Sequence, residues 1–294
     1  MIDYISMVAD ICKSQIQLND RNFVSIGEIE LFPDRNKRNG EIVQYQTKVQ
    51  NLLFTLNGTR LRVSNSLHKF QKGNNYSDFR FSEIQSSINQ IVKLTGVKAD
   101  DFEIKKLEFS LNINVQTPPK DYLSYFSNFK RKEYDKMRAG VCWYGNKYIL
   151  SEYALKIYDK TECTKRQDRI TLPDNLLRFE LQYLKSRKIP AVRVLSDLRI
   201  KENYYALFDE FIDKIKNISC MMEPNVSKLK SRDREIYFAS RHPGFMKTEN
   251  SINRRTCSYK IKRLNMALLR ISEKNMIDEF CKNLEKKFAN LIES

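Results

Sequence analysis

The chain has 294 residues, of which 41% are hydrophobic, and it carries 52 lysines and arginines against 36 acidic residues. This composition excludes a disordered or low-complexity chain and suffices for one large domain or two ordinary ones. The net charge of +16 exceeds what solubility requires, and nucleic acid is the commonest partner of so basic a surface. On charge alone, the alternative is a merely basic cytosolic protein.

The six cysteines lie far apart and form no C-x-x-C pair, so their spacing indicates neither a disulfide framework nor a zinc knuckle. The first residues, MIDYISMVADICK, lack a basic segment, and Asp3 and Asp10 interrupt the apolar run that a signal peptide needs. No apolar stretch is long enough to cross a membrane. We therefore expect a cytoplasmic protein with no membrane partner.

The first half of the chain reads as strand, strand, helix, strand. Residues 41–56 and 59–70 alternate between polar and apolar, and the Asn-Gly pair at 57–58 between them predicts a β-hairpin. Residues 77–96 carry apolar side chains at helical spacing. Residues 106–115 alternate almost without fault, which predicts a strand with one apolar face.

A second series of strands follows a polar, partly helical connection at 118–138. We predict strands at 141–150, 153–160 and 175–184, and then a helical stretch over about 191–217. Such a succession indicates an α+β sheet domain over residues 1–222. Its two halves, about 41–117 and 139–217, can be related and share one sheet.

The remaining residues, 223–294, are predicted to form a basic helical C-terminal region that binds DNA. Five cations fall within ten residues there with no acid among them: Arg254, Arg255, Lys260, Lys262 and Arg263. Cations of this kind contact phosphates, so we expect DNA binding with a steep dependence on salt.

Strand parity predicts a polar side of the sheet. Side chains two residues apart on a strand share a face. Tyr153 then falls on the apolar face, unless a β-bulge intervenes. The polar face is predicted to carry His68, Glu108, Asn112, Lys156, Tyr158, Lys160, Arg178 and Glu180.

This set of side chains fits phosphodiester chemistry. Carboxylates together with a histidine or an asparagine can hold a hard divalent cation, which makes Glu108, Glu180, His68 and Asn112 the candidate ligands. A tyrosine hydroxyl is a known covalent nucleophile, and nearby lysines or a metal would raise its phenolate fraction. The competing interpretation is a solvated sheet face with ordinary ion pairs. No pair of histidines flanks a hydrophobic residue, and no P-loop motif occurs.

Four segments taken in order resemble the rolling-circle replication initiators of phages and plasmids. They are NSLHKFQKGNNYSDF (65–79), LEFSLNINV (107–115), YALKIYDKTE (153–162) and LLRFELQYLKSRKI (176–189). The likeness is greatest to the filamentous-phage gene II type, and it extends to staphylococcal plasmid initiators.

The resemblance implies a ferredoxin-like antiparallel sheet with helices on one face, and a nuclease that uses Mg²⁺ or Mn²⁺. Such a protein nicks one strand of single-stranded or hairpin origin DNA and leaves a 5′-phosphotyrosine and a 3′-OH primer. It would act in the cytoplasm of a host bacterial cell, with host replication proteins as further partners. A non-catalytic origin-binding or copy-control protein is the alternative.

Carried over by position, Tyr158 matches the tyrosine of the Tyr-Asp-Lys element, with Lys156 and Lys160 as its basic neighbours. In the plasmid relatives the nucleophile lies near the position of Ala154, so Tyr153 is a second candidate if a bulge turns it to the lysine face. The residues predicted to contact DNA are Lys69, Lys147, Arg178, Arg254, Arg255, Lys260, Lys262 and Arg263.

Overall fold

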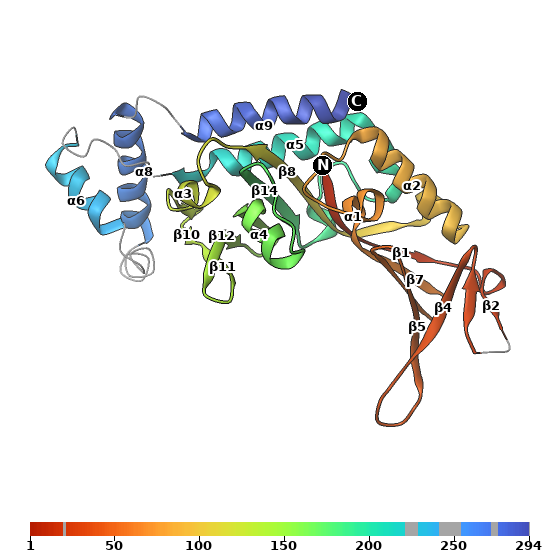
Figure 1. The fold of residues 1–294 in the computed structure, drawn as a ribbon. Helices are drawn as coiled ribbons and strands as arrows, with labels where there is room; N and C mark the ends of the chain where they lie inside the picture. The colour runs from red at the N-terminus through yellow and green to blue at the C-terminus, as the bar shows by residue number, and fades with distance from the viewer. Residues whose placement is uncertain (20–21, 221–228, 241–253, 272–275, 294) are drawn as a thin grey trace.

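A large antiparallel sheet organises the molecule. The computed structural model describes residues 1–19, 22–220, 229–240, 254–271 and 276–293. Within these residues, twelve strands form one sheet in the order β11-β12-β13-β14-β8-β1-β7-β6-β5-β4-β3-β2 (Figure 1). A second sheet of three strands has the order β10-β9-β15.

The strands are β1 (Ile2–Asp10), β2 (Gln17–Leu18), β3 (Val24–Ile26), β4 (Ile29–Arg35), β5 (Ile42–Val49), β6 (Leu52–Asn57), β7 (Arg60–Ser66), β8 (Glu103–Asn114), β9 (Phe126–Phe129), β10 (Lys132–Glu133), β11 (Asp135–Ala139), β12 (Cys142–Ile149), β13 (Tyr153–Asp159), β14 (Leu176–Tyr183) and β15 (Ile218–Cys220). The α-helices are α1 (Leu67–Lys72), α2 (Phe81–Thr95), α3 (Pro119–Leu123), α4 (Lys160–Gln167), α5 (Lys201–Lys216), α6 (Ser231–Ser240), α8 (Arg254–Ile271) and α9 (Met276–Glu293). Short 3-10 helices lie at Lys13–Gln15, Ala99–Asp101, Ser186–Lys188 and Leu195–Arg199.

The apolar face of the sheet is covered by α2, α5 and α9. Alternation in β8 turns Phe109 to this side, where its ring meets Phe211 of α5 at 5.3 Å and Phe288 of α9 at 6.3 Å between centroids. Helices α5 and α9 lie side by side along the sheet (Figure 1). Burying one such aromatic side chain stabilises the fold by roughly 1.5–3 kcal/mol, so this layer supplies much of the core.

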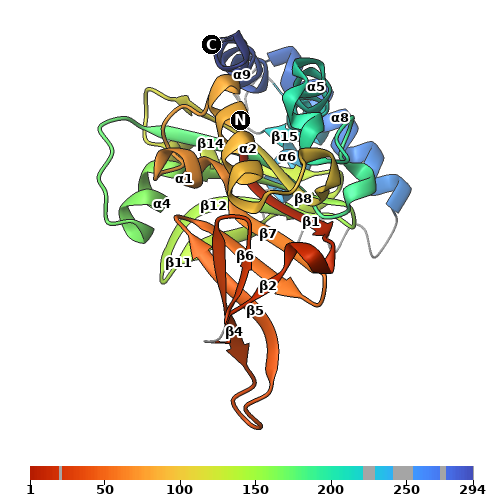
Figure 2. The same cartoon turned by 90° about the vertical axis from the view of Figure 1, so that its right-hand side faces the viewer.

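One edge of the sheet extends beyond the helices. Strands β4 and β5 pair from Phe32↔Gln46 to Arg35↔Ile42 and project as a two-stranded arm (Figure 2). The side chains of Phe32 and Ile42 are exposed there.

The predicted hairpin at 57–58 is confirmed, but the runs on either side are shorter strands than expected. Asn57 pairs with Arg60 across the turn between β6 and β7. The run 41–56 divides into β5 and β6. The run 59–70 ends in helix α1, because the Ser66 hydroxyl accepts a hydrogen bond from the Lys69 amide at 3.0 Å and caps the helix.

The strands predicted over 106–115, 153–160 and 175–184 are confirmed as β8, β13 and β14. The stretch 118–138, predicted as a polar and partly helical connection, contains the helix α3 and in addition the strands β9, β10 and most of β11. Both predicted halves contribute to the single sheet. They differ in strand order, since β1 lies between β7 and β8 whereas β13 pairs directly with β14. The ferredoxin-like duplication stays a prediction.

The described part of the C-terminal region is helical, as predicted, but it divides between two cores. Helices α6 and α8 pack around Tyr237 and Leu264. Helix α9 instead joins the main core through Phe280 and Phe288. Among the helices described, none is long and apolar enough to span a membrane.

Candidate active site

Polar side chains gather on the sheet face opposite α5 and α9, as strand parity predicts. In the register of β13 and β14, Lys156 pairs with Glu180 and Tyr158 pairs with Arg178. Strand β8 lies on the other side of β14 and brings Glu108 to the same face. All but Lys156 are largely buried.

Three carboxylates meet at the centre of this face. Asp3, Glu108 and Glu180 each offer an oxygen, and these oxygens all lie within 4.8 Å of one another. Asp3 was not predicted, because no strand was expected at the start of the chain. The pairing of β1 with β8 shifts register between Ile2 and Ile5, and this bulge turns Asp3 to the polar face.

Arg178 is buried beneath the three carboxylates and holds them by hydrogen bonds and charge. Its side chain is 1% exposed and donates hydrogen bonds to Asp3 at 2.5 Å, to the Ser110 hydroxyl at 2.6 Å and to the Asn75 carbonyl at 2.7 Å. Burial opposes ionisation of Asp3, but Arg178 and the Ser66 hydroxyl outweigh it and lower the pKa of Asp3 to about 2. The prediction that Arg178 contacts DNA is therefore corrected, since its guanidinium is enclosed by protein groups.

Lys156 bridges the other two carboxylates. Its ammonium lies 2.5 Å from Glu180 and 3.3 Å from Glu108. Burial and the negative charge of Glu180 raise the pKa of Glu108 to about 8, so Glu108 is mostly protonated at neutral pH. Burial also acts against ionisation of Glu180, but Lys156 and Arg178 lower its pKa. The pKa values of the two carboxylates are thus shifted in opposite directions.

The two candidate nucleophiles lie on opposite faces of the sheet. The Tyr158 hydroxyl lies 3.1 Å from Glu180, to which it can donate, and its side chain is 6% exposed. Burial raises the pKa of Tyr158 well above 10, more than Arg178 lowers it. Tyr153 stays on the helix-covered face, because β13 keeps a regular register with both neighbours and the bulge that would turn Tyr153 is absent. Its ring instead lies beneath Lys130 and Lys214.

Two further tyrosines border the cluster and were not predicted. Tyr4 follows Asp3 in β1 and is half-buried, and both burial and Glu108 raise its pKa. Tyr144 is left unpaired by a register shift between β11 and β12, and its ring meets that of Tyr158 edge-on at 6.2 Å. Both positions depend on β-bulges, which leave no signal in a pattern of alternation.

The predicted ligands His68 and Asn112 lie outside the three-carboxylate cluster. His68 is on α1 rather than on a strand, and its ring stacks on Phe79 at 4.7 Å. Burial lowers the pKa of His68 to about 2, with a further contribution from the N-terminal amine. Asn112 donates to the Tyr76 carbonyl and accepts from Arg178, so it holds the loop after α1 against the sheet.

The remaining predicted lysines differ in accessibility. Lys160 is buried, its ammonium lies 2.7 Å from the Asn75 side chain, and burial followed by repulsion from Arg178 lowers its pKa to about 8. Lys69 pairs with Asp168 at 3.2 Å, and this contact links α1 to the end of α4. Lys147 is opposite Lys156 on the polar face and is partly exposed.

The predicted cations of the C-terminal region lie along α8. Arg255 and Lys262 are exposed and Lys260 is partly exposed. Arg263 pairs with Asp233 of α6 at 2.5 Å, so it links two helices. The side chain of Arg254 lies outside the described part of the structure.

Neither models of known protein families nor curated proteins give a match to this chain. The chemistry of the site therefore has to be judged from its own groups. Carboxylates, a lysine and a phenol in mutual contact can accept a proton, carry positive charge to a phosphate and supply an oxygen nucleophile.

Proposed function

We propose that this chain nicks and rejoins single-stranded origin DNA during rolling-circle replication, through a tyrosine. One observation carries the proposal: the Tyr158 hydroxyl lies 3.1 Å from Glu180, inside the cluster that also holds Asp3, Glu108 and Lys156. The resemblance of the sequence to phage and plasmid initiators supplies the reaction class. Host replication proteins in a bacterial cytoplasm would then be its partners.

The nucleophile and its proton acceptor are already in contact. The Tyr158 oxygen attacks the phosphorus of a DNA phosphodiester while its proton passes to Glu180. The bond between phosphorus and the 3′ oxygen breaks, and the 3′ oxygen takes up a proton from water. The products are a 5′-phosphotyrosine link and a free 3′ hydroxyl that can prime synthesis. Rejoining is the same exchange in reverse.

The residues that would hold Mg²⁺ or Mn²⁺ are Asp3, Glu108 and Glu180. Their carboxylate oxygens are the hard ligands that these ions prefer, and their separation of at most 4.8 Å suits a shared ion. A bound ion would draw negative charge from the phosphate oxygens. The Lys156 ammonium forms an ion pair with Glu180 in this structure. Because a metal ion would compete for the same carboxylate, we expect metal binding to break this ion pair.

The burial of Tyr158 favours the second candidate function. A phenol that is 6% exposed, with a pKa raised well above 10, does not meet DNA without a movement of the groups above it. A non-catalytic DNA-binding protein, acting in origin recognition or copy control, would need no such movement. Tyr4, half-buried near Glu108, is a more accessible phenol than Tyr158.

A covalent-adduct assay separates these functions. Labelled single strands tiling the replicon that encodes the chain are incubated with the protein and Mn²⁺, and adducts that survive SDS are counted. We expect a wild-type adduct that Tyr158→Phe reduces at least 100-fold and that EDTA abolishes. Tyr153→Phe is the matched control and should retain the adduct. Loss with Tyr4→Phe, and not with Tyr158→Phe, would move the nucleophile to β1. Salt-sensitive binding without any adduct would establish the non-catalytic function.

A further inference from the structure

The turn between β9 and β10 has an unusual composition. Phe129 pairs with Lys132, so the turn consists of Lys130 and Arg131 alone. Their φ angles are 49° and 67°, and both therefore lie in the left-handed region that a type I′ turn demands. Asn-Gly is the favoured pair at such a turn, and each non-glycine residue costs on the order of 1 kcal/mol. The sequence places two cations at this position instead.

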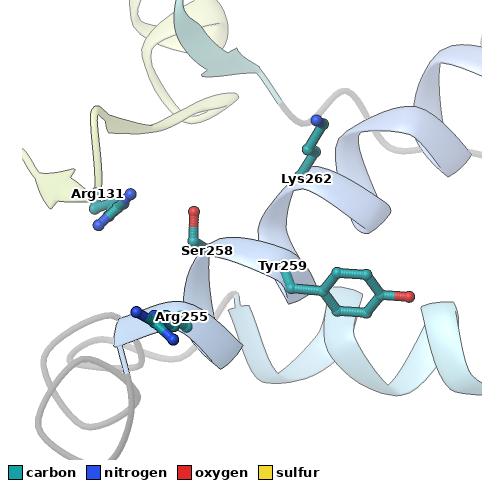
Figure 3. Close-up of a pocket in the computed structure, with 5 residues that line it drawn as sticks. All are labelled: Arg131, Arg255, Ser258, Tyr259 and Lys262. Carbon is teal, nitrogen blue, oxygen red and sulfur yellow. The ribbon is translucent and has the colours of Figure 1, made fainter.

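The side chains of Lys130 and Arg131 lie in different environments. The Lys130 ammonium lies 5.7 Å from the ring centres of both Phe129 and Tyr153, so it packs on aromatic rings. Arg131 borders a pocket of about 330 Å³ between the turn and α8 (Figure 3). The pocket lies outside the carboxylate cluster and shares no residue with it.

Helix α8 supplies the other wall of the pocket. Positions three, four and seven residues apart share a helix face, so Arg255, Ser258, Tyr259 and Lys262 all reach the same side. In Figure 3 the Arg131 side chain lies across a gap from Ser258 of α8, while the Tyr259 ring points away from Arg131. The lining thus contains three cations and no acid.

One acid of the neighbouring helix α6, Asp233, has its own partner outside the pocket. Asp233 is held by Arg263 at 2.5 Å, and Arg263 is not among the lining residues. Arginine forks and a hydroxyl are the groups that recognise phosphate oxygens. The lining cations are exposed, and a single exposed ion pair contributes little free energy. A polyanion such as DNA also releases counterions when it binds, so it gains more binding free energy than a free phosphate does.

We propose that this pocket binds a backbone phosphate of DNA, at a point separate from the carboxylate cluster. This inference rests on the proposed function for its choice of polyanion. It assigns a DNA contact to Arg131, which the sequence pattern did not indicate. Arg255 and Lys262 would contact the same phosphate as Arg131. The pocket would hold the DNA while the cluster acts on another phosphate.

A pair of variants at the turn tests the proposal. Arg131→Gly removes the cation from the pocket and suits the left-handed backbone, so the melting temperature should stay the same or rise. Lys130→Gly is the matched control, because it removes the same charge from the same turn but on the aromatic side. DNA affinity is measured by fluorescence anisotropy in EDTA, so that no strand cleavage contributes. We expect Arg131→Gly to weaken binding about 5–10-fold and to lower the slope against log salt by about 1, with a clearly smaller effect from Lys130→Gly.

The outcomes are distinct. Equal losses of affinity in the two variants would overturn the proposal, since a general effect of charge would then suffice. Arg131-dependent binding of inorganic phosphate as tight as that of DNA would overturn the choice of a nucleic-acid backbone. An Arg131-specific loss in a protein that forms no tyrosine adduct would support the pocket while the nicking function fails. Formation of the tyrosine adduct, with no effect of Arg131→Gly on DNA affinity, would support the nicking function and overturn the pocket.

Discussion

At the scale of single residues, burial decides what each titratable side chain can do. Arg178 was predicted to contact DNA, but at 1% exposure it serves Asp3 and Glu180. His68 was predicted to bind metal, yet its ring is stacked on Phe79, and its buried Nε2 has no hydrogen-bond partner among the residues that the structure describes. Arg178 therefore holds the carboxylates in place, and His68 packs beside the cluster as a buried, neutral ring.

His68 should make the fold sensitive to acid. Its pKa is lowered from 6.5 to about 2, chiefly by burial, so the unfolded chain takes up a proton that the folded chain refuses. The stabilising effect is complete above pH 6.5 and is lost as the pH falls below that value, by at most about 1.4 kcal/mol per pH unit. Urea unfolding at pH 7.5, 6.0 and 5.0 should show a shallower decline for His68→Phe. Parallel profiles for the variant and the wild type would contradict this.

At the scale of elements, bulges and turns adjust a pattern of regular strands. Parity placed Tyr158 and Glu180 correctly on one face, because β13 and β14 pair without interruption. It could not place Asp3 or Tyr144, whose strands shift register beside them. A single inserted residue reverses the face of everything beyond it, and alternation does not record where this happens.

Gly145 in β12 pairs with Tyr158 of β13, and the lack of a side chain at Gly145 leaves the space that Tyr158 occupies. A Cβ at this position would stand 2.4 Å from the Cβ of Tyr158 and 3.0 Å from the Ile157 carbonyl. We expect Gly145→Ala to lower the free energy of unfolding by about 1–3 kcal/mol and to displace Tyr158. Thermal unfolding checks the first effect and the adduct assay the second. Ile149→Ala, at an exposed position of the same strand, should change neither by a comparable amount.

At the scale of the whole molecule, helix α9 belongs to the core and not to a detachable tail. Phe288 stacks on Phe208 of α5 at 4.1 Å and also meets Phe109 of β8. The C-terminal region predicted from its charge thus serves two purposes. Helix α8 carries exposed cations such as Arg255 and Lys262, and α9 closes the apolar face of the sheet.

Phe288→Ala should destabilise the whole sheet domain. Removing a buried phenylalanine costs about 3–5 kcal/mol, because the cavity is only partly refilled. Denaturant unfolding followed by circular dichroism measures this loss. The matched variant is Phe238→Ala on α6, where the side chain is 55% exposed, and it should cost about 0.5 kcal/mol or less. Similar losses for both would show that α9 is not part of the core.

The sequence by itself determined the strands at β8, β13 and β14, the turn after Asn57 and the common face of Glu108, Lys156, Tyr158 and Glu180. These features follow from local alternation and turn chemistry, which neighbouring residues encode. Only the tertiary structure decided that Asp3 joins this face, that Arg178 is enclosed, and that Arg131 meets α8. Each of those contacts joins residues far apart in the chain, so it depends on packing and on bulges that local periodicity does not contain.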